Sequence, residues 1–311
     1  MPDIASAEET LLQTFCADES TAGAIFILGA PRTGSTFLYQ AMVHAFALPY
    51  ISNFTNFNFP TNPIVGLAAQ NGIRVDIGFQ SSFGKTNGAF QPSEGSAVLM
   101  NWFGGGHPSQ ILSTQILDGK ERHFHRTLAA TESLCGGPLL TKNPWNCFRA
   151  NYLTQSLPSA RFVWIRRDIR VAALSDLEAR YITKNGDAHA WNSATPANIE
   201  QLLQLPPVQQ VVENQIEFSK AISSALAKHA EGRWIEVWYE DLIADPQVSL
   251  DRIGALIKRS VQASYDQRSS IERAGRSLLA GDAAGVYKYV ASDASKFATF
   301  VHPSIGGEEV R

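Results

Sequence analysis

A glycine-rich turn near the start of the chain has the residue types that bind an oxyanion. Residues 29–36 read Gly-Ala-Pro-Arg-Thr-Gly-Ser-Thr and so combine two glycines, one arginine and three hydroxyl side chains. An apolar segment, residues 24–28, precedes the turn, and a helical pattern follows it. Backbone N–H groups and the helix dipole favour negative charge at a helix start, and Gly34 lets a ligand approach the backbone. The turn therefore predicts a binding site for a phosphate or sulfate group.

The turn differs from the phosphate-binding loop of nucleotide hydrolases at one position. Its two glycines have the Gly-x-x-x-x-Gly spacing of that loop, but Ser35 stands where the loop carries a lysine. Arg32 can supply the missing positive charge from within the turn. A strand-to-helix turn without a ligand is the alternative interpretation, although such a turn does not need an arginine and three hydroxyls.

Cationic residues also follow two later apolar segments. Lys142 ends residues 137–142, and Arg166 with Arg167 follow residues 161–165. Parallel strands end at one edge of a sheet, where α/β proteins bind their ligands, so these cations should face the turn. The chain has 26 basic and 29 acidic residues and a formal net charge of −3, so a local cluster of cations predicts a polyanionic ligand.

The segment after Arg167 predicts a second anion site. Ser175 lies seven residues beyond Asp168, nearly two helical turns, so Ser175 and Arg167 can face the same point. The alternatives are that Arg167 forms an ion pair, that Ser175 is an ordinary helix-surface residue, and that Lys142 is exposed to solvent.

These motifs together resemble those of the sulfotransferases that use 3′-phosphoadenosine 5′-phosphosulfate (PAPS). Residues 31–36 resemble the 5′-phosphosulfate loop of that family, and residues 167–170 (Arg-Asp-Ile-Arg) with Ser175 resemble its 3′-phosphate motif. Lys142 is similar to a lysine of the bacterial branch that is related to the tyrosylprotein and carbohydrate sulfotransferases. The resemblance covers residues 24–254.

The resemblance implies a donor, a product and a set of binding residues. PAPS is the donor substrate, 3′-phosphoadenosine 5′-phosphate (PAP) is the product, and no metal ion is expected. The implied ligands of the 5′-phosphosulfate are Arg32, Thr33, Gly34, Ser35 and Thr36, and those of the 3′-phosphate are Arg167 and Ser175.

The chain departs from the family pattern at two places. Ile169 replaces the proline that is usual in the second motif, and the tail lacks the Arg-Lys-Gly triplet with which the cytosolic branch binds the 3′-phosphate. Arg276 and Lys288 are the candidates to complete that site. By contrast, residues 239–242 (Tyr-Glu-Asp-Leu) look like a segment that is common in the family.

Transfer of a sulfonate group to a hydroxyl is an in-line displacement that needs positioned cations and a general base. Arg32 and Lys142 would neutralise charge on the transferring and departing groups. Glu94 is the first candidate for the base, because its Pro-x-Glu sequence before a helical pattern resembles one found in several bacterial sulfotransferases. His107, which follows three glycines, is the second candidate.

Residues 49–106 are rich in Asn, Gly, Pro and aromatic residues and are the expected acceptor-binding region. A carbohydrate hydroxyl is the first expectation for the acceptor, ahead of a glycolipid headgroup or a natural product. The aromatic residues within 46–59, together with Trp102 and Phe103, could contact a sugar ring or line an apolar pocket. The alternative is that these aromatic side chains belong to the core.

The composition bears on partners and location. The balanced charge predicts no nucleic-acid partner, and no apolar run approaches the ~20 residues that span a bilayer. Three cysteines without metal-ligand spacing, and no charged-then-apolar leader, favour a reducing compartment, so we expect a cytoplasmic protein. The sequence leaves the oligomeric state open.

The elements that position these residues follow a repeated pattern of strand, turn and helix. Four apolar segments are predicted to be buried strands, namely residues 24–28, 137–142, 161–165 and 234–238. This order predicts an α/β fold of the P-loop-like, three-layer type, with a central parallel sheet flanked by helices. Nothing marks a linker or a repeat, so residues 1–311 are expected to form a single sulfotransferase domain.

Two other functions are compatible with parts of this pattern. A P-loop nucleotide or small-molecule kinase would share the first turn and the sheet, but Ser35 in place of lysine and the lack of an acidic strand end for magnesium disfavour it. A non-catalytic nucleotide-binding protein would keep the turn, and the presence of Lys142 argues against it. The sequence therefore predicts a PAPS-dependent sulfotransferase.

Overall fold

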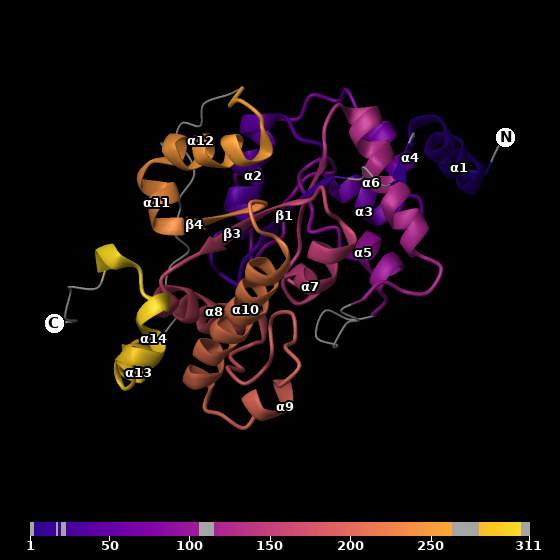
Figure 1. Cartoon of the computed structure of the whole chain (residues 1–311). Coiled ribbons are helices and arrows are strands. Elements are labelled where there is room, and N and C mark those ends of the chain that lie inside the picture. Colours follow the sequence, from indigo (N-terminus) through magenta and orange to yellow (C-terminus); the bar gives the residue numbers. More distant parts are fainter. Residues whose placement is uncertain (1–2, 17, 20–22, 106–114, 263–279, 306–311) are drawn as a thin grey trace.

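The computed structural model describes residues 3–16, 18–19, 23–105, 115–262 and 280–305. Within these residues, four parallel strands form one sheet in the order β2-β1-β3-β4 (Figure 1). The strands are β1 (Ala24–Leu28), β2 (Leu139–Lys142), β3 (Arg161–Arg166) and β4 (Trp234–Trp238). The prediction of a parallel sheet built from these four segments is confirmed.

Helices cover both faces of the sheet, because alternate residues of a strand point to opposite sides. Phe26 and Leu28 of β1 pack in one hydrophobic cluster, whereas Ile25 and Ile27 pack in another on the opposite face. The first cluster includes side chains of α5 (Ser96–Phe103), α6 (Glu121–Cys135), α7 (Asn146–Ser156) and α10 (Pro207–His229). The second includes α2 (Ser35–Phe46) and α12 (Pro246–Ile257). The three predicted layers are therefore present.

Each strand leads into a helix at the carboxyl edge of the sheet, through a short turn after β1, β2 and β3 and directly after β4. These helices are α2, α7, α8 (Ile169–Thr183) and α11 (Tyr239–Ala244). Asp168 caps α8, because its carboxylate accepts a hydrogen bond from the Arg170 backbone N–H at 3.0 Å. A break at Pro206 separates α9 (Ile199–Leu202) from α10, which begins at Pro207.

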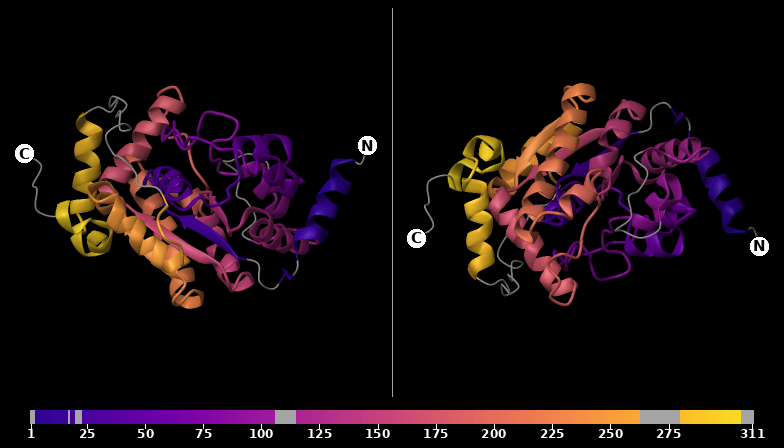
Figure 2. Two further views of the ribbon diagram at one scale, coloured as in Figure 1. Left: turned by 90° about the horizontal axis from the view of Figure 1, so that it is seen from above. Right: turned by 90° about the horizontal axis from the view of Figure 1, so that it is seen from below.

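The remaining helices lie at the two ends of the molecule (Figure 2). At the N-terminal end are α1 (Ile4–Phe15), α3 (Asn53–Asn58) and α4 (Pro63–Gln70), and at the opposite end are α13 (Ala280–Ala291), α14 (Ala294–Phe297), η3 (Ala298–Phe300) and η4 (Pro303–Ile305). Helices α3, α4 and α5 lie in the region 49–106, and α5 corresponds to the helical pattern that follows Glu94.

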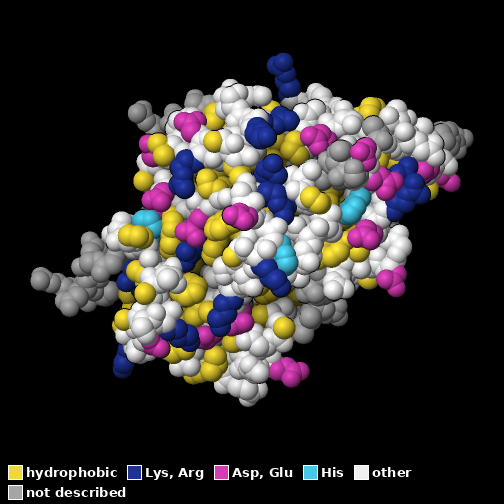
Figure 3. All heavy atoms as spheres, viewed as in Figure 1, with side chains coloured by type: hydrophobic (Ala, Val, Ile, Leu, Met, Phe, Trp, Pro, Cys, Tyr) yellow, Lys and Arg dark blue, Asp and Glu magenta, His cyan; other side chains and the backbone are white. Residues whose placement is uncertain are grey.

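Several of the aromatic residues that could line an acceptor pocket, within 46–59 and at 102–103, belong to the core instead. Phe46, Trp102 and Phe103 are at most 1% exposed, so the alternative interpretation is correct for these three rings. Phe57, in contrast, is 74% exposed. On the face of the molecule in Figure 3, basic and acidic side chains are interspersed without a single-sign patch. No helix among the described residues is long and apolar enough to cross a membrane.

Candidate active site

The turn after β1 has the conformation of an anion-binding cradle. Gly34 is the N-cap of α2 and has a φ of 85°, in the left-handed region. A Cβ at this position would lie 2.2 Å from the Tyr239 ring, so both the backbone angle and the available space require glycine. Ser35 and Thr36 follow in the first turn of α2, where backbone N–H groups point toward the turn. This geometry fits an anionic group such as a phosphosulfate.

Thr33 supports the turn from the inside. Its side chain is buried, and its hydroxyl donates to the Ala30 carbonyl at 2.7 Å. Below the turn, the Gly29 backbone N–H donates to Cys147 Sγ at 3.4 Å, and burial raises the pKa of the Cys147 thiol to about 12. The Thr33 hydroxyl therefore stabilises the turn.

A second group of residues converges beside the start of α2. Lys142, at the end of β2, is 7% exposed, and its Nζ donates to Thr36 Oγ1 at 3.2 Å and forms an ion pair with Glu94 Oε1. Asn143 fixes the position of Glu94, because Asn143 Nδ2 donates to the Glu94 carbonyl and to Ser96 Oγ, both at 3.1 Å. The Glu94 side chain is about 30% exposed and can be reached from solvent. The structure thus brings Thr36, Glu94 and Lys142 together, although they come from three separate parts of the chain.

Arg32 connects the turn to α8. Arg32 Nε donates to Ser175 Oγ at 3.1 Å, and Arg167 Nη1 donates to the Arg32 carbonyl at 3.0 Å. Desolvation lowers the pKa of the Arg32 guanidinium, an effect that the carboxylates of Asp176 and Glu178 oppose. Arg32 remains a cation at neutral pH because arginine is not deprotonated in proteins.

Residues of the segment 239–242 hold the second motif in place. The Arg167 guanidinium lies over the Tyr239 ring, 4.5 Å from its centroid. Glu240 Oε1 accepts a hydrogen bond from the Asp168 backbone N–H at 3.1 Å. The sequence identifies this segment only by family resemblance, and its contacts with Gly34, Arg167 and Asp168 are tertiary contacts that no local pattern reveals.

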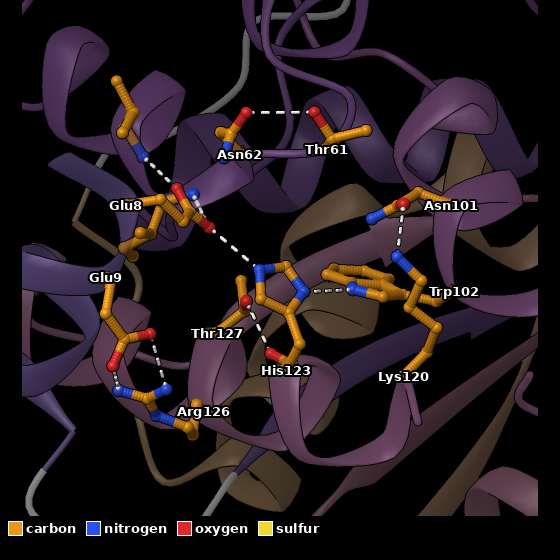
Figure 4. A network of polar contacts seen from close by, with 12 residues as sticks. Glu8, Glu9, Thr61, Asn62, Asn101, Trp102, Lys120, His123, Arg126 and Thr127 are labelled. Atoms are coloured by element: carbon orange, nitrogen blue, oxygen red, sulfur yellow. Dashed lines mark hydrogen bonds and ion pairs between the residues drawn. The ribbon is translucent and has the colours of Figure 1, made fainter. Parts of the chain in front are cut away.

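The remaining sequence candidates are His107, Arg276 and Lys288. His107 and Arg276 are outside the described residues, and Lys288 is an exposed residue of α13. His123 has a structural role, because its Nδ1 accepts from Trp102 Nε1 at 2.8 Å and its Nε2 contacts Glu8 at 3.1 Å (Figure 4). Since the indole nitrogen is always a donor, this pairing assigns the proton of a neutral His123 ring to Nε2.

A cavity of about 370 Å³ lies away from these residues. It is lined by His44 and Ala47 at the C-terminal end of α2, together with Tyr50, Gln70 and Ile73. Thr36 is at the other end of the same helix, so this cavity is separate from the cluster of Lys142 and Glu94.

The fold and the site define a P-loop-like α/β protein with a cradle for an anionic ligand and an adjacent lysine and carboxylate. The model of the sulfotransferase family matches residues 24–262, and the chain belongs to this family. It is therefore an enzyme of the sulfonate-transferring class.

Solved structures show the same fold. Sulfotransferase STF9 from Mycobacterium avium is 14% identical in sequence, with a TM-score of 0.52, and the alignment covers 93% of this chain and 72% of that chain. Sulfotransferase STF1 from Mycobacterium tuberculosis H37Rv is 16% identical, with a TM-score of 0.50, and the alignment covers 83% of this chain and 74% of that chain. No curated protein sequence matches this chain.

Proposed function

We propose that this enzyme transfers the sulfonate group of PAPS to a hydroxyl of a small-molecule or glycan acceptor and releases PAP. The proposal rests on one observation: Lys142 contacts both Glu94 and Thr36 beside the glycine turn. This places a cation and a carboxylate at the anion-binding end of α2, next to the pair formed by Arg32 and Ser175. PAPS would supply the activated sulfonate, and its two phosphates match the two cationic motifs.

The protein residues would have separate roles in this reaction. The turn amides and Arg32 would hold the 5′-phosphosulfate, and Lys142 would stabilise the negative charge that develops on the departing phosphate oxygen. Arg167 and Ser175 would bind the 3′-phosphate. Glu94 would accept the proton of the acceptor hydroxyl, and its ion pair with Lys142 would have to open first.

We place the acceptor beside residues 80–95. The backbone of Gly84 lies against Glu94, and the side chains of Ser81, Ser82 and Asn87 are exposed on the same segment. Exposed hydroxyl and amide groups favour a polar acceptor, so a carbohydrate hydroxyl ranks ahead of a glycolipid headgroup or another natural product.

The simplest test of the proposal compares the melting temperature of the protein with different nucleotides. PAP should raise the melting temperature of the protein, because a ligand that binds only the folded state stabilises it. ATP with magnesium should not, since Ser35 replaces the lysine of a nucleotide-hydrolysing loop. Stabilisation by ATP with magnesium and not by PAP would favour a kinase and contradict the proposed donor.

A further inference from the structure

A tight turn at residues 82–85 packs against three of the proposed catalytic residues. The Phe83 ring lies over the Arg32 guanidinium, with 5.1 Å between Arg32 Cζ and the ring centroid. A Cβ on Gly84 would lie 2.9 Å from Glu94 Oε1 and 3.8 Å from Lys142 Nζ. The turn therefore forms a wall of the site and leaves no room for a side chain at position 84.

The backbone of this turn is unfavourable for the residue at its tip. Ser82 and Lys85 exchange two backbone hydrogen bonds of 2.9 and 3.0 Å, and the two residues between them, Phe83 and Gly84, have φ values of 50° and 91°. Turns with two left-handed residues favour Asn-Gly, because most other side chains are strained there. Phe83 therefore occupies a position where asparagine would fit the backbone better.

Neighbouring elements fix the turn from both sides. Asn53 Nδ2 donates to the carbonyls of Thr86 and Gly88, both at 3.0 Å, and Gln40 Nε2 donates to the Gln80 carbonyl at 3.4 Å. These contacts connect the turn to α3 and α2. Phe83 is strained and is held in place over a residue of the proposed site, which indicates a role other than stability.

We propose that Phe83 is a specificity-determining residue that excludes water from the transferring sulfonate and so favours the acceptor hydroxyl. This inference rests on the proposed function. Without the ring, a water molecule can approach the sulfonate beside Arg32, and its oxygen forms the new bond to sulfur while the bond from sulfur to the 5′-phosphate oxygen breaks. Sulfate and PAP leave, and Glu94 takes the water proton before passing it to solvent. The ring over Arg32 suppresses this wasteful reaction.

Hydrolysis of labelled PAPS without any acceptor tests the inference and needs no knowledge of the acceptor. Phe83→Asn should release labelled sulfate faster than the wild type by about fivefold or more, with PAP affinity within about twofold. Its melting temperature should equal or exceed that of the wild type, because asparagine tolerates a left-handed backbone. Phe83→Tyr, which keeps the ring, should hydrolyse PAPS at the wild-type rate.

Phe79→Asn is the matched control. Phe79 has a φ of 49°, and its ring contacts Phe37 and His44 instead of Arg32. This variant should leave PAPS hydrolysis unchanged.

Three outcomes would count against the proposals. If the Phe83→Asn variant still binds PAP and hydrolyses PAPS at the wild-type rate, the proposed role of Phe83 is wrong. A Phe83→Asn melting temperature well below that of the wild type would assign Phe83 a structural role instead. Failure of the wild-type protein to bind PAP would instead reject the proposed function, and the inference with it.

Discussion

At the scale of single residues, Arg32 links the two proposed anion sites. In the structure its Nε is bound to Ser175 Oγ, and its carbonyl accepts from Arg167. Its φ of 66° is unusual for a residue with a side chain and costs about 1 kcal/mol or more, a form of strain that gathers at functional sites. Ser175 Oγ accepts from Arg32, and its O–H proton is the group that a 3′-phosphate would accept. The hydroxyl can therefore connect Arg32 to a bound 3′-phosphate.

Ser175→Ala tests which of the two partners the hydroxyl serves. If Ser175 binds the 3′-phosphate, PAP affinity should fall by about tenfold or more, the value of a hydrogen bond to a charged group. The affinity for adenosine 5′-phosphate, which lacks the 3′-phosphate, should not change. Titration calorimetry with both nucleotides measures the difference. An equal loss for both nucleotides would show that Ser175 acts only through Arg32.

The thiol of Cys147 should be inert in the folded protein. Its pKa of about 12 means that roughly one molecule in ten thousand carries the reactive thiolate at pH 8. The side chain is also only 1% exposed below the glycine turn. Modification with a chromogenic disulfide reagent, mapped by mass spectrometry, should label the less buried Cys16 well before Cys147. Labelling of Cys147 at the rate of Cys16 would indicate that the turn opens in the native state.

At the scale of elements, the strand ends could be predicted better than the contacts between them. Apolar runs such as residues 24–28 predict the strands because a strand buried on both faces has no polar positions. The rule that parallel strands end at one edge then places Arg32 and Lys142 near each other. It could not show that Thr33 turns its hydroxyl inward or that Ser175 binds Arg32, since those choices depend on tertiary packing.

The helices of residues 49–106 were harder to predict for a physical reason. Helix α3 has six residues and α4 has eight, too few to show a clear apolar period. The start of α4 is also fixed by a distant side chain, because Glu8 accepts hydrogen bonds from the N–H groups of Ile64 and Val65. The turn at 82–85 likewise depends on Asn53 and was not foreseen.

A pair of glycine variants tests the close contact between α2 and α11. Gly34 and Gly72 have φ values of 85° and 83°, but a Cβ on Gly72 would meet nothing within 4 Å. Gly72→Ala should therefore cost only the backbone strain, about 1 kcal/mol. Gly34→Ala should cost a further ~1–3 kcal/mol, because its methyl group overlaps the Tyr239 ring. Denaturant unfolding measures both.

The same two glycine variants also distinguish the effect of backbone strain from an effect on PAP binding. Gly34→Ala should weaken PAP binding by about tenfold or more, since a displaced Tyr239 no longer supports Arg167. Gly72→Ala should bind PAP as the wild type does. Equal stability and equal PAP affinity of the two variants would contradict the packing described for the turn.

At the scale of the whole molecule, we propose that residues 1–311 form one domain. The family match ends at residue 262, yet α13 packs on α8 and α10 beyond it. Val286 belongs to a hydrophobic cluster with Ile169 and Ile216, and the His302 backbone N–H donates to Asp168 Oδ2 at 3.0 Å. The C-terminal segment therefore contacts the proposed 3′-phosphate motif directly.

Thermal unfolding should show one cooperative transition if the chain is a single domain. Val286→Ala, at a fully buried position of α13, should lower its midpoint by a few degrees, equivalent to about 2 kcal/mol. Val248→Ala, at a position that is 55% exposed on α12, is the matched control and should have little effect. A separate early transition in Val286→Ala would indicate that the C-terminal helices form an independent unit.

Transfer of a labelled sulfonate group tests the central claim most directly. The protein would be incubated with PAPS labelled in its sulfonate group and a panel of sugars, glycolipids and phenols. The account predicts a labelled acceptor and an equal amount of PAP, and a loss of turnover in Glu94→Gln by about a hundredfold or more with PAP affinity unchanged. Full turnover by Glu94→Gln would move the base to another residue, with His107 the next candidate. If the wild-type protein left all of the label on PAPS and did not bind PAP, the assignment of this site to PAPS-dependent transfer would be wrong.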